Sequence, residues 1–259
     1  MSHIPRKRFG QNFLHDQNVI QRIVQSIQPR NGQHLVEIGP GQGAMTTPLL
    51  EVLGEMDVIE LDRDLVEPLQ RKLARVGQLH IHQADALKFD FCGLYKKEGS
   101  KLRVVGNLPY NISTPLLFHL IDQIHCIEDM HFMLQKEVVE RIVAKPGCKD
   151  YGRLGIMLSY YCEAQMLFTV GPEAFNPPPK IDSAIIRLVP HAHPPVELSQ
   201  PEFLGQIVRA AFAQRRKTLR NNLKDLLDAN TIQSLGIDPG IRAEQLTLSE
   251  FARLANALV

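Results

Sequence analysis

A glycine-rich turn, Gly39, Gly41 and Gly43 in VEIGPGQG (36–43), follows a short apolar run that is typical of a buried strand. Glycines let the backbone turn sharply and approach a ligand closely. Their spacing differs from the G-x-G-x-x-G of dinucleotide-binding proteins, and Glu37 would repel a nearby pyrophosphate. An acid at this point favours instead a ligand that carries an ammonium or sulfonium group.

Two further acids lie near the ends of the next two predicted strands. Glu60 follows the glycines by about 20 residues, where an acidic side chain can bind both hydroxyls of a ribose. Asp85 is placed to accept a hydrogen bond from an adenine amino group. Either acid alone is explained as readily by a loop carboxylate that caps a helix. The glycine turn and the two acids in series predict a pocket for S-adenosylmethionine.

The end of a fourth strand, in VVGNLPYNIS (104–113), carries Asn107, Leu108, Pro109 and Tyr110. The exocyclic amine of adenine is a weak nucleophile, and the Asn107 side-chain oxygen and a main-chain carbonyl near Leu108 can accept hydrogen bonds from it. Pro109 keeps the turn rigid, and Tyr110 offers a face for a base that has left its stack. Taken alone this is a turn after a strand. Beside the glycine loop it predicts the site of the methyl acceptor.

These residues need a scaffold, and apolar runs with two different periods supply it. Strands are expected at 34–39, 57–62, 78–85, 101–107 and 129–135, and helices at 17–28, 40–53, 63–76, 114–124 and 136–144. This alternation predicts a parallel sheet that is covered on both faces, with the candidate residues at its carboxyl edge. Two later strands, 164–170 and 183–189, are expected to add an antiparallel edge.

The C-terminal part has a different pattern. The segment PHAHPPVELSQP (190–201) is the clearest linker, and helices are expected after it. We therefore expect an α/β catalytic domain at 1–190, with a Rossmann-like sheet of the S-adenosylmethionine-dependent methyltransferase type, and a small all-α domain at 191–259. Thr247 and Glu250 have the spacing of a capping box.

Charge is distributed unevenly along the chain, which has 29 basic and 28 acidic residues. Residues 1–30 and 207–224 together hold 11 basic residues and one acidic residue, which leaves 18 basic and 27 acidic residues elsewhere. Two solvated helix faces would explain this pattern, and so would a surface for a polyanion. In the second segment, basic residues recur near helical spacing, which predicts one continuous helix with a basic face.

Composition excludes several classes of protein. The chain has 259 residues, 44% of them hydrophobic and 22% charged, which is ordinary for a soluble globular protein. No apolar stretch resembles a secretory signal or a membrane span, so a cytoplasmic protein is expected. Cys92, Cys126, Cys148 and Cys162 lack C-x-x-C spacing and the histidines lack ligand spacing, which favours reduced thiols, no disulfide and no metal site.

The chain closely resembles the KsgA-type ribosomal small-subunit RNA adenine dimethyltransferases. The matching segments run nearly from end to end: RFGQNFL (8–14), VEIGPGQGAMT (36–46), VIELD (58–62), ADAL (84–87), VVGNLPYNISTPLL (104–117), MLQKEVVERI (133–142), FNPPPKIDSAIIRL (175–188) and QRRKTLRNNLK (214–224). The resemblance implies two methyl transfers from S-adenosylmethionine to each of two adjacent adenosines. These adenosines would lie in a hairpin loop near the 3′ end of 16S rRNA, in an immature small subunit.

The resemblance and the motifs together assign roles to individual residues. The expected cofactor-binding residues are Asn12, Leu14, Gly39, Gly41, Glu60, Asp85 and Asn107. The expected residues around the target base are Asn107, Leu108, Pro109, Tyr110 and, from the other side, Phe175. The expected RNA-binding residues are Arg6, Lys7, Arg8, Arg215, Arg216, Lys217, Arg220 and Lys224. A monomer without a metal is expected.

Three alternatives compete with this interpretation. A methyltransferase of antibiotic resistance that acts on large-subunit rRNA has a similar Asn-x-Pro-aromatic loop, but the segment 214–224 argues against it. A non-catalytic RNA- or DNA-binding factor would not need the intact glycine loop and both acids. A small-molecule methyltransferase would not need the basic C-terminal segment.

Overall fold

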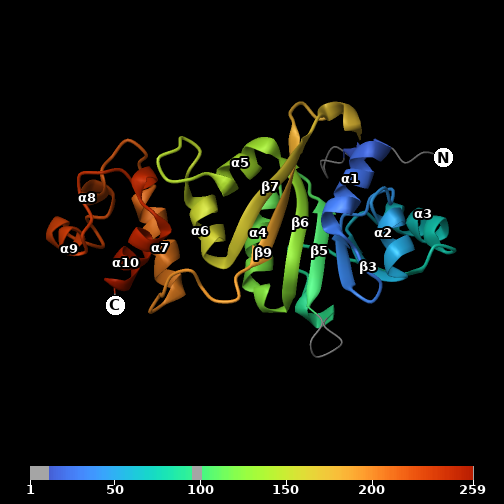
Figure 1. The fold of residues 1–259 in the computed structure, drawn as a ribbon, viewed down its shortest axis with the longest axis horizontal. Coiled ribbons are helices and arrows are strands. Elements are labelled where there is room, and N and C mark those ends of the chain that lie inside the picture. The colour runs from blue at the N-terminus through green and yellow to red at the C-terminus, as the bar shows by residue number, and fades with distance from the viewer. Residues whose placement is uncertain (1–11, 95–100, 259) are drawn as a thin grey trace. The chain divides into compact units, whose positions relative to one another are not determined.

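The computed structural model describes residues 12–94 and 101–258 (Figure 1). The chain packs into two compact units. The first is drawn from residues up to 139 and from 165–190, and the second from 140–164 and from residue 191 onward. The chain passes from the first unit to the second after residue 190, where the domain boundary was expected, but residues 140–164 also belong to the second unit. The domain limits 1–190 and 191–259 therefore stay a prediction.

Strands alternate with helices in the first unit. The strands are β1 (Phe13–Leu14), β2 (His34–Ile38), β3 (Glu55–Glu60), β4 (Gln78–Gln83), β5 (Leu102–Asn107), β6 (Ile127–Gln135), β7 (Cys162–Val170), β8 (Phe175–Asn176) and β9 (Ser183–Pro190). The helices are α1 (Gln17–Ile27), α2 (Thr46–Leu53), α3 (Arg63–Leu73) and α4 (Ser113–Asp122), and α5 (Lys136–Val143) follows β6 at the boundary of the two units. Two short 3₁₀ turns, η2 (Cys92–Leu94) and η3 (Ile124–Cys126), precede β5 and β6.

Seven strands form one sheet in the order β4-β3-β2-β5-β6-β9-β7. The pairs from β4 to β6 are parallel, and β9 pairs antiparallel with β6. This confirms the Rossmann-like parallel sheet and its antiparallel addition. In this order β9 lies between β6 and β7, so the strand that comes later in the sequence is the inner one. This fits its composition, because β9 is apolar and mostly buried whereas β7 exposes much of its length. Strands β1 and β8 form a separate pair that brings Leu14 opposite Phe175.

A buried ion pair links β5, β6 and the end of α1. Arg103 Nε and Nη2 each donate to Asp129 at 2.8 Å. Arg103 Nη2 also donates to the Ile27 carbonyl at 2.6 Å, and Nη1 donates to Gln33 Oε1 at 2.9 Å. Both charged side chains are about nine-tenths buried or more, so this network holds two charges away from water.

Helices build the second unit around a core of its own. They are α6 (Arg153–Tyr161), α7 (Pro201–Ala211), α8 (Leu219–Asn222), α9 (Ala229–Ser234) and α10 (Leu248–Asn256). Ile156 on α6 packs in one cluster with Leu204 and Phe251, and the Tyr151 hydroxyl donates to the Leu246 carbonyl at 2.8 Å. These contacts explain why 140–164 joins this unit. The capping box at Thr247, the N-cap residue of α10, is confirmed.

The continuous basic helix expected across 207–224 is wrong. Helix α7 ends at Ala211, residues 212–218 are not helical, and α8 has only four residues. Distant segments provide hydrogen bonds that replace helical ones: the Leu219 amide donates to the Ile241 carbonyl, and the Arg220 amide donates to the Pro239 carbonyl. The Asn222 side chain donates to the Ala211 carbonyl at 2.6 Å, which satisfies the end of α7.

Two expectations concern features outside the sheet. The expectation that all cysteines are reduced is wrong for Cys92 and Cys126, which form a disulfide across 34 residues of sequence, while Cys148 and Cys162 are free. Spacing of this length carries no pattern by which a sequence could reveal the pair. In the part of the chain that the structure describes, no helix has the length and apolar character needed to cross a membrane.

Candidate functional site

The glycine turn connects β2 to α2 with a left-handed backbone at each glycine. The φ angles of Gly39, Gly41 and Gly43 are 68°, 57° and 77°, a region that favours glycine. A Cβ at Gly43 would lie 2.7 Å from a Leu69 methyl, and one at Gly41 would lie 3.1 Å from the Phe13 ring. At Gly39 no described atom lies within 4 Å of that position. Glycine at position 43 is therefore needed for the packing of Leu69 against the turn, whereas Gly39 borders free space in the cavity.

Glu60 ends β3 and is held beside the glycine turn. The Gly41 amide donates to Glu60 Oε2 at 3.2 Å, and the Asp62 amide donates to Oε1 at 2.8 Å. Burial raises the pKa of the Glu60 carboxyl, and the backbone hydrogen bonds oppose this rise. Each carboxylate oxygen can accept more than one hydrogen bond, so both stay available to ligand hydroxyls.

Asp85 follows β4 in a tight turn. Its Oδ1 accepts from the Leu87 amide at 3.0 Å, and its carbonyl accepts from the Lys88 amide at 2.9 Å. The turn fixes the carboxyl group at the carboxyl edge of the sheet, one strand beyond Glu60. This is the position from which an acid can reach the far end of a nucleoside held by Glu60.

Glu37 is the acid most removed from water in this part of the sheet. It is 1% exposed, and its Oε2 has no hydrogen-bond partner among the described residues although it lines a cavity. Burial raises the pKa of the Glu37 carboxyl to about 7. The neighbouring Thr46 side chain opposes this rise, and the negative charge of Glu60 adds to it. A bound ligand with a positive charge would compensate the cost of burying this carboxylate in its ionised form.

Replacing Glu37 by glutamine is expected to change how stability depends on pH. The folded ligand-free protein binds a proton at Glu37 up to about pH 7, whereas the unfolded chain releases it near 4.5. The free energy of unfolding should therefore lose up to roughly 3 kcal/mol from this group as pH rises through that range. Urea unfolding at pH 5 and pH 8 measures this effect. The free energy of unfolding of Glu37→Gln minus that of the wild type should be larger at pH 8 than at pH 5. An equal difference at both pH values would contradict the assignment.

The loop that follows β5 is held from several sides. The Asn107 Nδ2 group donates to the Asn12 carbonyl at 3.2 Å, which leaves the side-chain oxygen as the acceptor end of this amide. The Leu108 amide donates to the Met133 carbonyl, and the Ile112 amide donates to the Pro109 carbonyl, both at 3.1 Å. The loop is therefore a rigid turn that leads into α4.

Two aromatic rings border this loop. The Tyr110 hydroxyl and the Ser183 hydroxyl share a hydrogen bond at 2.9 Å, which restricts rotation of the tyrosine ring. Phe175 in β8 lies opposite Leu14 in β1 and is 3% exposed. Both rings line the same cavity as Asn107.

One cavity of about 380 Å³ collects the expected site residues. It is lined by Asn12, Leu14, Gly39, Gly41, Glu60, Asp85, Asn107, Leu108, Pro109, Tyr110 and Phe175, which include every expected cofactor-binding and base-binding residue. This volume suits a nucleoside-sized ligand together with a base. The fold therefore brings together, from four successive strand ends and two distant short strands, the residues that the sequence grouped by motif.

Leu61 is one of the cavity residues that the sequence predictions missed. Leu61 directly follows Glu60, lines the cavity and is 52% exposed, so it offers an apolar surface for a flat ring. An aliphatic residue directly after a strand-end acid is the sequence signal that would have found it. Phe13 also lines the cavity, next to Gly41, and Ser183 holds Tyr110 through a hydrogen bond; neither position has a local sequence signal.

The basic residues of the second unit lie on its surface. Arg215, Arg216, Lys217, Arg220 and Lys224 are all exposed. Because the helix is interrupted, the first three occupy the 212–218 turn, which is held by a hydrogen bond from the Arg215 guanidinium to the Lys149 carbonyl. The other expected RNA contacts, Arg6, Lys7 and Arg8, lie outside the described residues.

The residues of the cavity fit the expected cofactor. S-adenosylmethionine carries an ammonium and a sulfonium group, a ribose and an adenine. Glu37 Oε2, which has no hydrogen-bond partner among the described residues, can pair with the positive charge of this cofactor. The free space beside Gly39 lets the backbone approach the ligand closely, and Glu60 lies where it can bind the ribose hydroxyls.

Comparison with known proteins shows the family of the chain. Residues 2–259 match the family described as Ribosomal RNA adenine dimethylase. The "Ribosomal RNA small subunit methyltransferase A" of Pseudomonas aeruginosa is 59% identical over 256 residues, covering 99% of this chain and 95% of the relative. The protein of the same name from Methylococcus capsulatus is 57% identical over 258 residues, covering 100% and 99%.

Two solved structures share the fold. A dimethyladenosine transferase from Plasmodium falciparum aligns with a TM-score of 0.76 at 23% identity, over 93% of this chain and 95% of that chain. The 23S rRNA methyltransferase ErmE aligns with a TM-score of 0.74 at 25% identity, over 95% and 99%. Since the family match spans residues 2–259 and relatives of 57–59% identity cover nearly the whole chain, this chain belongs to the ribosomal RNA adenine dimethylase family and is an S-adenosylmethionine-dependent methyltransferase.

Proposed function

We propose that this enzyme methylates the exocyclic amino groups of two adjacent adenosines in a hairpin loop near the 3′ end of 16S rRNA, giving dimethyladenosines during assembly of the small ribosomal subunit. The observation that carries the proposal is that the Asn107–Tyr110 loop and the glycine-loop acids line one cavity. The small-subunit target is supported by the names of relatives that are 57–59% identical over almost the full length.

In this proposal the cofactor lies over the first three strand ends. When bound, S-adenosylmethionine supplies an electrophilic methyl group on a positively charged sulfur. Glu60 accepts hydrogen bonds from ribose hydroxyls, and Asp85 accepts one from the adenine amine. Gly39 allows the backbone to approach, and Glu37 balances the positive charge. Asn12, Leu14 and Gly41 complete the contacts.

The target adenine is held by the loop after β5. Asn107 Oδ1 accepts a hydrogen bond from the amine, because its Nδ2 group is engaged by Asn12. This contact directs the nitrogen lone pair toward the methyl group, and positioning supplies much of the rate. The ring of Tyr110 stacks on the base, which is worth about 1–3 kcal/mol. Phe175 flanks the base, which must leave its helix to enter.

RNA contacts outside the cavity are assigned to the basic residues of the second unit. Exposed arginines and lysines bind the phosphate backbone and orient the substrate without reading its sequence. The shape of a folded RNA then supplies recognition. We further propose that the enzyme acts as a cytoplasmic monomer on an immature small subunit.

Charge reversal of Arg216 and Arg220 to glutamate is expected to weaken RNA binding by tenfold or more. Each lost phosphate contact should also lower the slope of log Kd against log salt by about 0.7–0.9. Filter binding to the 3′ domain of 16S rRNA at several salt concentrations checks both effects. Arg71→Glu on α3, at a side chain that is 71% exposed, is the matched control and should bind as the wild type does. Equal salt slopes in all variants would contradict the assignment.

The alternative of a large-subunit target rests on the likeness to the 23S rRNA methyltransferase ErmE. Purified enzyme is incubated with labelled S-adenosylmethionine and with unmethylated small or large subunits, followed by nucleoside mass spectrometry. Dimethyladenosine from the small subunit alone is expected. Label in the large subunit would contradict the proposed target, and cofactor binding without any transfer would favour a non-catalytic RNA-binding role.

A further inference from the structure

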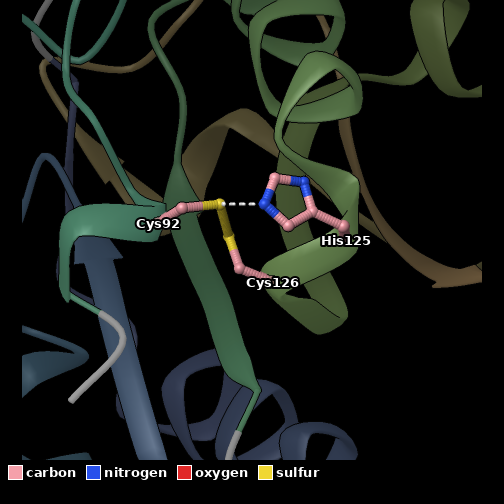
Figure 2. Close-up of side chains that lie close together, drawn as sticks. All are labelled: Cys92, His125 and Cys126. Carbon is pink, nitrogen blue, oxygen red and sulfur yellow. Dashed lines mark hydrogen bonds between the residues drawn. A yellow bond between two sulfur atoms is a disulfide. The ribbon is translucent and has the colours of Figure 1, made fainter.

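A second cluster of reactive side chains lies outside the cavity, at η2 and η3 (Figure 2). Cys92 comes from η2, and His125 and Cys126 come from η3. The Cys92–Cys126 disulfide joins the two turns, and His125 Nε2 lies 3.4 Å from Cys92 Sγ. The two sulfur atoms and a ring nitrogen all lie within 4.8 Å of one another.

We propose that Cys92, His125 and Cys126 form a redox-controlled site for a thiophilic divalent cation, Zn²⁺, that opens when the disulfide is reduced. Two thiolates and an imidazole are ligands that zinc prefers. Ligand atoms on a tetrahedral zinc with Zn–S of about 2.3 Å and Zn–N of about 2.0 Å are separated by about 3.5 Å. The 3.4 Å between Cys92 Sγ and His125 Nε2 already matches this separation.

The backbone around the three ligands is fixed by one glutamine. Gln123 Oε1 accepts from the Phe91 amide at 2.7 Å and from the Cys92 amide at 3.3 Å, so the α4 end and η2 are tied together without the disulfide. The Gln123 carbonyl lies 3.1 Å from Cys126 Sγ and 3.5 Å from Cys92 Sγ. A carbonyl oxygen, which can also coordinate a metal ion, therefore lies beside the two sulfur atoms. Reduction of the disulfide would leave the ligands near one another.

Solvent access distinguishes this cluster from the remaining cysteines. His125 is exposed, Cys92 is half-buried and Cys126 is buried, so a cation can enter from the imidazole side. Burial raises the pKa of the Cys162 thiol to about 12, which makes it a poor metal ligand. Cys148 is exposed, and it is not part of this cluster.

The chemistry of the two states balances in protons and electrons. Two molecules of a thiol reductant give two electrons and two protons to the S–S bond, leaving two protein thiols and one reductant disulfide. Zn²⁺ then displaces the two thiol protons and accepts the lone pair of the neutral imidazole, so two protons are released for each ion bound. A disulfide sulfur is not a thiolate, so the oxidised state lacks the anionic ligands.

Zinc titration of the full-length protein tests the proposal. The protein is reduced with a phosphine, freed of reductant without oxygen, and titrated with ZnCl₂ against a chromophoric chelator. The reduced protein should bind one zinc per chain, and the oxidised protein none. Isothermal titrations in buffers of different ionisation enthalpy should show release of up to two protons per zinc. Co²⁺ in place of zinc should give a thiolate charge-transfer band.

Variants identify the ligands. His125→Ala changes an exposed side chain and should weaken zinc binding at least tenfold, with unchanged circular dichroism. Cys92→Ser should abolish the cobalt charge-transfer band or reduce it by about half, and Cys148→Ser, the matched control, should bind as the wild type does. The proposal is overturned if the reduced protein binds no zinc, if the oxidised protein binds it equally well, or if His125→Ala binds with wild-type affinity.

Discussion

Replacing Asn107 by alanine is expected to slow methyl transfer by a factor on the order of 100 to 1,000, the range seen when one preorganised polar group is removed from an active site. The structure explains why no neighbour substitutes for it. The Asn107 amide is held by the Asn12 carbonyl, so its oxygen occupies a fixed position in the cavity. Single-turnover assays with saturating cofactor and small-subunit substrate measure the effect.

Two further measurements separate chemistry from binding in this variant. RNA affinity should stay within about twofold, because Asn107 is not among the basic residues assigned to the RNA backbone, and the described ones lie in the second unit. Cofactor affinity, measured by equilibrium dialysis, reports any loss of the expected cofactor contact. Asn18→Ala, which removes an exposed amide on α1, is the control and should keep full activity. Full activity of Asn107→Ala would contradict the proposed role.

Replacing Arg103 by methionine is expected to lower the free energy of unfolding by about 3–5 kcal/mol, the largest stability effect predicted for this chain. Asp129 would stay buried, at 5% exposure, without the two 2.8 Å bonds from the guanidinium. The carbonyl of Ile27 would also lose its donor. Urea unfolding followed by circular dichroism measures the change.

A second substitution tests the physical reason for this loss. Adding Asp129→Asn to Arg103→Met removes the remaining buried charge, so the double variant should be more stable than the single one. Arg71→Met on α3 breaks a surface pair with Glu67, which spans 3.5 Å, and should cost less than about 1 kcal/mol. A similar cost at Arg71 and Arg103 would show that burial of the pair has no special effect.

The sequence alone determined the parallel sheet, the glycine turn and the series of acids at its carboxyl edge. These features depend on short-range physics: side-chain period decides which face of a strand or helix is buried, and a turn with positive φ needs glycine. The strand order places Glu60, Asp85 and Asn107 at one edge because parallel strands end together. The composition of each strand end was therefore enough to group these residues.

Only the tertiary structure decided the features that depend on contacts between distant parts of the chain. The hydrogen bonds from 239–241 end the expected basic helix and place Arg215, Arg216 and Lys217 in a turn. The Cys92–Cys126 bond and the raised pKa of Glu37 likewise arise from proximity and burial in the folded state. Local propensity is worth a few tenths of a kcal/mol per residue, so tertiary hydrogen bonds and burial override it wherever the two disagree.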